Sequence, residues 1–290
     1  MSDTAVLTPP VPVPRGTRRK PTMLDAIRWE ASKVGAQARA RWTLLICLVA
    51  PVAIVIVINA QQRPPKDSLY GRYIHQSGFA VALLVVGFAA QWILPLLTAL
   101  VAGDIFASED QHGTWKTVLT RSTSRGQLFW AKTVTALGFA TLALFILATV
   151  TIVASVLVVG HQGLIGLTGQ VIPSGTSARL IVESWAIQLA PLLGFTCLAI
   201  LLSVRSRNPA VGIAAPVVLG LVMQLAGGLG GISAVRPLLL TTPFETWHGL
   251  LAQDRFYAPL IAGLVVSAVW CSACLAAALA TLLRRDITEG

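Results

Sequence analysis

The sequence predicts an all-α protein that crosses a membrane six times. Hydrophobic residues make up 55% of its 290 residues and charged residues only 12%, about half the charged share of a soluble domain. Six apolar stretches are each long enough to cross about 30 Å of hydrocarbon as a helix. Most charged residues lie between or outside these stretches. The composition excludes a disordered chain and disfavours a soluble enzyme.

The two ends of the chain are polar. Residues 1–21 are rich in Pro and then basic, and they lack the apolar core of a signal peptide. We expect a disordered cytoplasmic tail there, a single six-span domain over residues 22–285, and a short cytoplasmic tail over residues 286–290.

Residues 22–41 have the pattern of an amphipathic helix. Thr22 and Asp25 have the spacing of a capping box, with Asp in place of Glu or Gln. One face carries apolar side chains: Leu24, Ile27, Ala31 and Val34. A helix lying in the membrane interface fits this pattern, and a plain extension of the first span is the alternative.

The six apolar stretches are the predicted spans. They cover residues 43–60, 79–102, 130–159, 181–203, 210–231 and 258–283. Four prolines inside them predict kinks, which membrane helices tolerate: Pro51, Pro95, Pro191 and Pro216. All four cysteines lie in apolar runs, so we interpret them as small buried residues and not as a metal site.

The distribution of Lys and Arg predicts the orientation. If the N-terminus lies inside, 16 of the 22 basic residues fall in cytoplasmic segments and 6 in outside loops. This asymmetry places both termini in the cytoplasm. It also explains the net charge of +10 without a nucleic-acid partner.

The spans are poor in ionisable residues, which argues against a proton-driven antiporter but not against a sodium site made of carbonyls and hydroxyls. Four polar residues inside them are candidates for a translocation path: Gln91, Gln188, Thr196 and Gln224. The chain has no phosphate-binding G-x-x-x-x-G-K-[ST] motif, and its four histidines lack metal-ligand spacing. We therefore expect no catalytic residues, no metal and no cofactor in this chain.

The segment between the second and third spans, residues 103–132, carries the most local signals. Ser108 with Gln111, and Ser124 with Gln127, have the spacing of capping boxes. Gly113 breaks the first turn, and Thr114 is placed to cap a second short helix. An apolar face on that helix would consist of Trp115, Val118 and Leu119. The segment predicts a short amphipathic helix on the membrane surface or in the groove of a partner.

This segment is similar to a cytoplasmic loop in permease subunits of type-2 ATP-binding-cassette exporters. That loop has an acidic residue, Gly-Thr, a short helix and Ser-Arg before a Lys in the next span. The matching residues here are Glu109, Gly113, Thr114, Leu119, Arg121, Ser124, Arg125 and Lys132. Ser122 and Thr123 depart from it, because many relatives have a Pro-containing turn there. The likeness covers about residues 22–285.

The resemblance implies roles for two segments. Residues 109–121 would be a coupling helix that docks on an ATPase subunit, and residues 22–41 would be an elbow helix. The implied contact residues are Glu109, Gly113, Thr114, Trp115, Lys116, Val118, Leu119, Arg121, Ser124 and Arg125. The elbow residues are Leu24, Ile27, Glu30 and Val34. Binding of lipid headgroups is the alternative role for Arg121 and Arg125.

The resemblance also implies partners. These are two cytoplasmic ATPase subunits that bind ATP and Mg, a second permease copy or a similar subunit, and the lipids of a bacterial plasma membrane. Small residues in the fifth span suggest a subunit interface, with a flexible hinge as the alternative: Gly220, Gly227 and Gly231.

The last outside loop, residues 232–257, predicts a short re-entrant helix in the outer leaflet. Thr242 is placed to cap it, Pro243 suits its first position, and Glu245 would close a capping box. Phe244, Trp247, Leu250 and Leu251 would share its apolar face.

The function that these observations favour is ATP-driven export of an amphipathic or lipid-like substrate such as a drug or peptide. Two alternatives stay open: a secondary transporter or channel that works alone, and a non-transporting membrane anchor of a complex.

Overall fold

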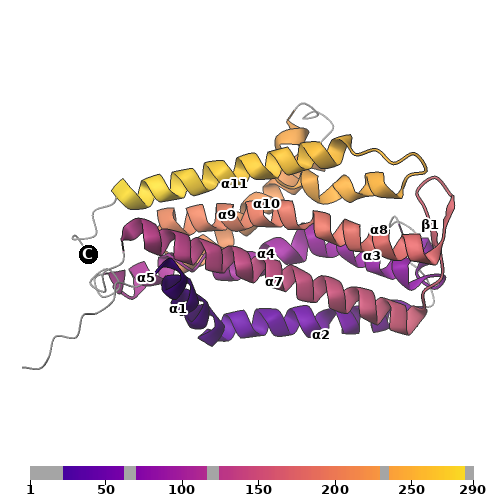
Figure 1. The fold of residues 1–290 in the computed structure, drawn as a ribbon, viewed down its shortest axis with the longest axis horizontal. Coiled ribbons are helices and arrows are strands. Elements are labelled where there is room, and N and C mark those ends of the chain that lie inside the picture. The colour runs from indigo at the N-terminus through magenta and orange to yellow at the C-terminus, as the bar shows by residue number, and fades with distance from the viewer. Residues whose placement is uncertain (1–21, 62–69, 116–123, 229–234, 285–290) are drawn as a thin grey trace, which may run out of the picture.

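A computed structural model describes residues 22–61, 70–115, 124–228 and 235–284. Its helices run along one long axis and form a bundle, with a small hairpin at one end (Figure 1). It is 82% helical and has six helical segments that are long and apolar enough to cross a membrane. The predicted class, an all-α polytopic membrane protein, is confirmed.

The amphipathic segment is separate from the first span. Helix α1 (Met23–Ala36) ends before Gln37, whose extended backbone starts a new direction, and α2 (Ala38–Ala60) follows at an angle (Figure 1). The capping box of Thr22 and Asp25 is present at the start of α1. The prediction of one continuous helix over residues 22–41 was therefore wrong.

The face of α1 that packs on the rest of the chain coincides only in Val34 with the predicted apolar face. It consists of Ala26, Glu30 and Val34, while Leu24 is 54% exposed. These three residues recur every fourth position, which keeps them on one side of a helix. This side faces α7, because Glu30 pairs with a Lys on that helix.

The second span contains a π-helical turn. Helix α3 (Gly78–Phe88) continues into η2 (Ala89–Ile93), and α4 (Leu94–Ala102) follows with Pro95 at its start. Proline has no N–H and cannot make the i→i−4 bond of an α-helix. The irregularity expected at Pro95 thus takes the form of a wider turn directly before it.

The middle of the chain holds a short helix and a long one. Helix α5 (Ala107–Gln111) follows the second span, and α7 (Arg125–Val159) forms the third. The Ser124 hydroxyl accepts a hydrogen bond from the Gln127 N–H at 3.1 Å, as predicted. Helix α7 begins five residues before the predicted span, since this cap fixes its start.

The fourth span consists of two helices. Helices α8 (Ser174–Ile187) and α9 (Leu189–Ser206) meet at Gln188, three residues before Pro191. Before α8 lies an antiparallel pair of two-residue strands, β1 (Leu164–Ile165) and β2 (Val171–Ile172), which the sequence analysis did not predict.

The remaining elements complete the bundle and its loops. They are η1 (Gly71–Tyr73), α10 (Pro209–Gly228), η4 (Arg236–Leu238), η5 (Thr242–Leu251) and α11 (Ala258–Arg284). The segment for which a re-entrant helix was predicted forms the 3₁₀ helix η5, with Pro243 near its start. Its N-cap is Thr241 without a side-chain bond, so the predicted capping box of Thr242 and Glu245 was wrong.

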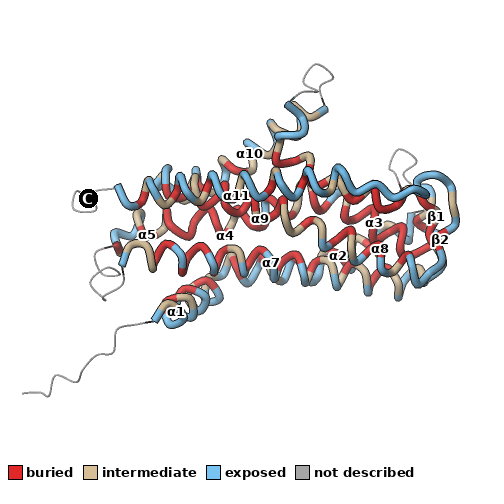
Figure 2. Tube along the Cα trace, turned by 45° about the horizontal axis from the view of Figure 1, so that its top comes forward, coloured by how far each residue is buried: buried red, intermediate tan, exposed pale blue. Residues whose placement is uncertain are grey.

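Helix α9 is the centre of the packing. It contacts α4, α7, α10 and α11, while α7 contacts α1, α2 and α3. Buried residues concentrate between the helices, and outer helices such as α11 expose one side (Figure 2). The end of α4 meets α10 where Gly103 faces Gly212: a Cβ on Gly103 would lie 2.2 Å from the Gly212 carbonyl oxygen.

Candidate functional site

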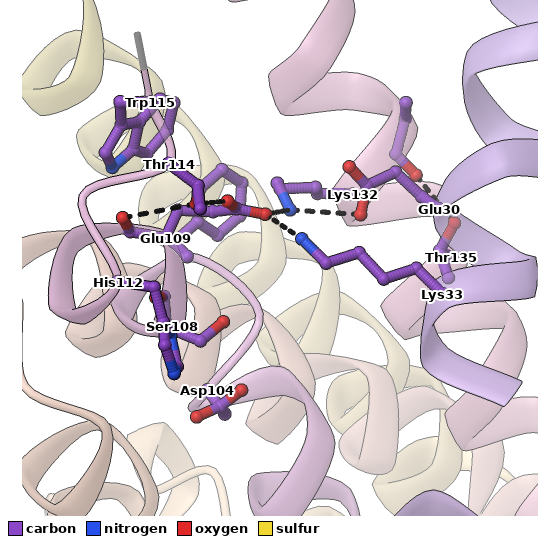
Figure 3. A network of polar contacts seen from close by, with 12 residues as sticks. Glu30, Lys33, Asp104, Ser108, Glu109, His112, Thr114, Trp115, Lys132 and Thr135 are labelled. Carbon is purple, nitrogen blue, oxygen red and sulfur yellow. Dashed lines mark hydrogen bonds and ion pairs between the residues drawn. The ribbon is translucent and has the colours of Figure 1, made fainter. Parts of the chain in front are cut away.

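Four charged side chains join α1, α5 and α7 near the end of the bundle where α11 ends (Figures 1 and 3). The Lys132 Nζ lies 3.0 Å from Glu30 Oε2 and 3.0 Å from Glu109 Oε1. Lys33 of α1 pairs with the same oxygen of Glu109. Two carboxylates thus face two ammonium groups, and we call this set the charge cluster.

The charge cluster is mostly buried. The side chains of Lys132, Glu30 and Glu109 are each 1% exposed, whereas that of Lys33 is 35% exposed. Transfer of a single charge from water to such a site costs several kcal/mol, which only well-placed opposite charges can offset. The three buried groups therefore depend on one another.

The start of α5, the helix that carries Glu109, is hydrogen-bonded to α9. The Ser203 hydroxyl accepts hydrogen bonds from the N–H groups of Phe106 and Ala107 at 3.2 and 3.0 Å. These are the free N–H groups at the start of α5, which a capping residue would otherwise satisfy. The predicted cap, Ser108, instead lies inside α5, so that prediction was wrong.

The Gly-Thr pair after α5, residues 113 and 114, ends the helix and supplies hydrogen bonds to Glu109. Gly113 has a φ of 62°, a left-handed conformation that suits glycine and ends the helix. The Thr114 hydroxyl then donates to the Glu109 carboxylate, and its backbone N–H donates to the Glu109 carbonyl at 3.1 Å. Gly113 breaks the turn as predicted, while the Thr114 hydroxyl binds back to Glu109.

Trp115 is a core residue in this structure. It is 6% exposed and belongs to an apolar cluster with Phe106 and Phe129, and its Nε1–H donates to Asp110 at 3.0 Å. The sequence predicted it as contact area for a partner. Most of its side chain packs against this chain instead, and the partner contact stays a prediction. Four further predicted contact residues lie outside the described part of the chain: Lys116, Val118, Leu119 and Arg121.

Other charged residues form contacts between helices at the same end of the bundle. Arg39 of α2 pairs with Asp104, which is 3% exposed and lies between α4 and α5. Arg125 at the start of α7 donates to the Leu283 carbonyl at 3.5 Å. The helices that flank the loop of residues 103–124 are thus connected to α2 and α11.

The four candidate path residues do not converge. Gln188 and Thr196 are fully buried, and the Thr196 hydroxyl donates to the Leu192 carbonyl at 2.8 Å. Gln91 lines one cavity and Gln224 another. A translocation path lined by these residues in a pair of permease subunits stays a prediction.

The proposed interface glycines also find contacts within the chain. A Cβ on Gly220 would lie 2.9 Å from the ring of Phe195, so the space beside Gly220 is filled by α9. A Cβ on Gly227 would lie 3.7 Å from Leu239, and Gly231 lies outside the described residues. The subunit interface at these glycines stays a prediction.

Sequence reasoning missed the pairing of the charge cluster. It counted Lys132 as a cytoplasmic charge and Glu30 as part of an elbow helix. The available signal was the position of Lys132 inside the apolar run LFWAKTVTALGF. A charge at such a site requires a partner, and Glu30 and Glu109 are two of the few acidic residues near that end.

The comparison with known families agrees with this architecture. Residues 26–227 match the family described as ABC-2 family transporter protein, a range that includes Glu30, Glu109 and Lys132. No curated protein matches the chain. The matched range exceeds half of the chain and contains most of its membrane helices. The chain therefore belongs to the ABC-2 family of transporter proteins, as a multi-pass membrane permease that works with ATP-binding-cassette ATPase subunits.

Proposed function

We propose that the chain is the membrane-spanning subunit of an ATP-driven exporter and that residues 103–124 transmit motion from the ATPase. Two permease subunits, as two copies or as one copy with a similar subunit, would form the path. Two cytoplasmic ATPase subunits, which hold ATP and Mg, would bind beneath them. The observation that carries this proposal is the charge cluster.

The charge cluster is suited to transmit a displacement. Its buried ion pairs link α5 to α1 and α7, and the hydrogen bonds of Ser203 link α5 to α9. A force on the loop after α5 would therefore move three long elements together. ATPase closure would then shift the balance between inward-open and outward-open states, provided that the ATPase binds one state more tightly.

The position of the cluster supports a cytoplasmic assignment for this end. Helices α1 and α5 and the C-terminal end of α11 lie together there (Figure 1), and the predicted cytoplasmic segments hold 16 of the 22 basic residues. The positive-inside rule then orients the chain in a bacterial plasma membrane with both termini inside. The apolar spans support an amphipathic or lipid-like cargo.

The test is ATP-driven transport by the permease–ATPase complex in liposomes. Glu109→Gln retains the size of the side chain but removes its charge, so we expect the complex to assemble while transport falls at least tenfold. Glu183→Gln is the matched control, because Glu183 forms an exposed pair with Arg179 on α8. Its transport should equal that of the wild type.

Three results would contradict the proposal. Unchanged transport by the assembled Glu109→Gln complex would remove the coupling role of the cluster. Transport by the purified chain without an ATPase would support a secondary transporter instead. An assembled wild-type complex that hydrolyses ATP but moves none of a panel of amphipathic compounds would support a non-transporting anchor.

A further inference from the structure

A cavity of about 140 Å³ lies between the second span and η5. Its lining includes Tyr70, Leu84, Gly87, Gln91, Trp247 and His248. Among the described residues that line it, none is an Asp, Glu, Lys or Arg. The lining is therefore mostly apolar and aromatic. Five of its side chains can also form hydrogen bonds: Tyr70, Gln91, Trp92, Trp247 and His248.

The volume of the cavity suits one aromatic ring, and its open side is marked by Phe88 and Trp92, which are 62% and 45% exposed. An apolar cavity of about 150 Å³ in another protein stays dry and binds benzene. Here the rings of Tyr70 and Trp247 stack with centroids 6.3 Å apart, and those of Trp247 and His248 are 4.1 Å apart. A Cβ on Gly87 would lie 4.0 Å from the Trp247 ring, so a larger side chain there would occupy the space.

Tyr70 supplies a hydroxyl without a partner. It is 2% exposed, and its hydroxyl makes no hydrogen bond to any described residue. A buried polar group without a hydrogen bond costs about 1–3 kcal/mol. Burial, with a smaller effect of Tyr73, raises the pKa of Tyr70, so the hydroxyl keeps its proton and can donate. A ligand with a hydrogen-bond acceptor would satisfy it.

The π-helical turn η2 forms one wall of this cavity. It contains Gln91 and Trp92, both of which line the cavity, and such turns occur frequently at functional sites. The Gln91 amide donates to Glu245 at 3.2 Å, which holds η2 against η5. Burial lowers the pKa of His248, although Glu245 opposes this, and the neutral ring keeps the cavity uncharged.

We infer that this cavity binds the uncharged aromatic group of an amphipathic small molecule, whose acceptor atom takes a hydrogen bond from Tyr70. The inference rests on the proposed function, because it assigns a cargo class to the same permease. It also explains why an aromatic-lined cavity, an unpartnered hydroxyl and a π-helical turn lie at one place.

The probe is p-azidobenzamide, a photoreactive benzene ring with an amide acceptor. The full chain in lipid nanodiscs is irradiated with it, with and without excess benzamide, and labelled peptides are mapped by mass spectrometry. We expect labelling, suppressed by benzamide, within residues 83–92 and at Trp247 or His248. No ATPase is needed, so binding is measured apart from transport.

Two variants and one control sharpen this experiment. Gly87→Leu should reduce labelling at least tenfold, because its side chain fills the cavity. Tyr70→Phe removes only the hydroxyl. It should raise the half-saturating probe concentration about two- to tenfold, the change in affinity expected when one hydrogen bond is lost. Gly138→Leu on α7 is the control, because nothing lies within 4 Å of its Cβ position.

The outcomes separate this inference from the proposed function. Labelling spread over exposed faces of the helices, or unaffected by both variants, would overturn the inference. If Gly87→Leu does not give a folded protein, Tyr70→Phe decides alone. Cavity labelling without ATP-driven transport would contradict only the exporter proposal, and transport of amphiphiles without cavity labelling would contradict only this inference.

Discussion

Lys132→Met tests whether the charge cluster holds the helices together. The two side chains have similar length, but Met carries no charge. The change leaves Glu30 without a cation, since Lys132 is the only one that pairs with it among the described residues. Glu109 keeps Lys33, which is partly exposed.

The magnitude follows from the geometry. Each ion pair of Lys132 spans 3.0 Å, which corresponds to about 5.5 kcal/mol of Coulomb energy at an effective dielectric constant near 20. Much of this offsets the desolvation of the ions. The measured cost of removing one partner of a buried pair is about 3–5 kcal/mol, because an uncompensated charge stays behind. We expect this cost for Lys132→Met.

The assay is thermal unfolding of the purified protein in detergent, followed by the loss of the monodisperse species. A destabilisation of this size should lower the midpoint by on the order of 10 °C. Lys33→Met is the matched control: it removes a cation from Glu109, but from a partly exposed pair, and should cost about 1 kcal/mol or less.

A double variant makes the prediction stricter. Glu30→Met with Lys132→Met removes both members of one pair and leaves Glu109 with Lys33. It should be more stable than Lys132→Met alone, by about 0.5–3 kcal/mol of coupling energy. The reasoning is refuted if Lys132→Met unfolds at the wild-type temperature, or if the double variant is no more stable than the single one.

Three further changes address the surroundings of the cluster, each checked by the same unfolding assay. Gly103→Ala should cost about 1–3 kcal/mol, because its Cβ would strike the backbone of α10, whereas Gly126→Ala meets nothing within 4 Å. An equal effect of both would contradict the close helix contact. Ser203→Ala should cost about 1–3 kcal/mol per backbone N–H left unsatisfied. Ser272→Ala on α11 is its control, because Ser272 is exposed and its hydroxyl only donates to the Ala268 carbonyl of its own helix. Gly113→Ala should cost about 1 kcal/mol because its φ is 62°, and a stabilising effect would refute the argument.

The extent of the spans was predictable because hydrophobic length is a local property of the chain. All six predicted spans fall largely within helices of the structure, and α11 (Ala258–Arg284) differs from its prediction by one residue at the C-terminal end. The caps of Thr22 and Ser124 were predictable for the same reason, since each bond joins residues three apart.

Features that depend on distant contacts were not predictable in this way. Leu24 and Trp115 are two examples. The sequence predicts an apolar face with Leu24, but the face of α1 that packs on the chain carries Ala26 and Glu30. The ring of Trp115 is buried against this chain's own side chains. The pattern of apolar residues predicts that a helix has a face, and the neighbouring helices decide which face is used.

The sequence by itself determined an all-α membrane domain, the number of its spans and the loop that resembles a coupling segment. Only the tertiary structure decided that Glu30 pairs with Lys132, which is 102 positions away in the sequence. It also decided that the Ser203 hydroxyl of α9 accepts the hydrogen bonds at the start of α5. Hydropathy and capping act over one or two turns of helix. The pairing of buried charges depends on which helices lie side by side, and that is fixed only when the bundle has packed.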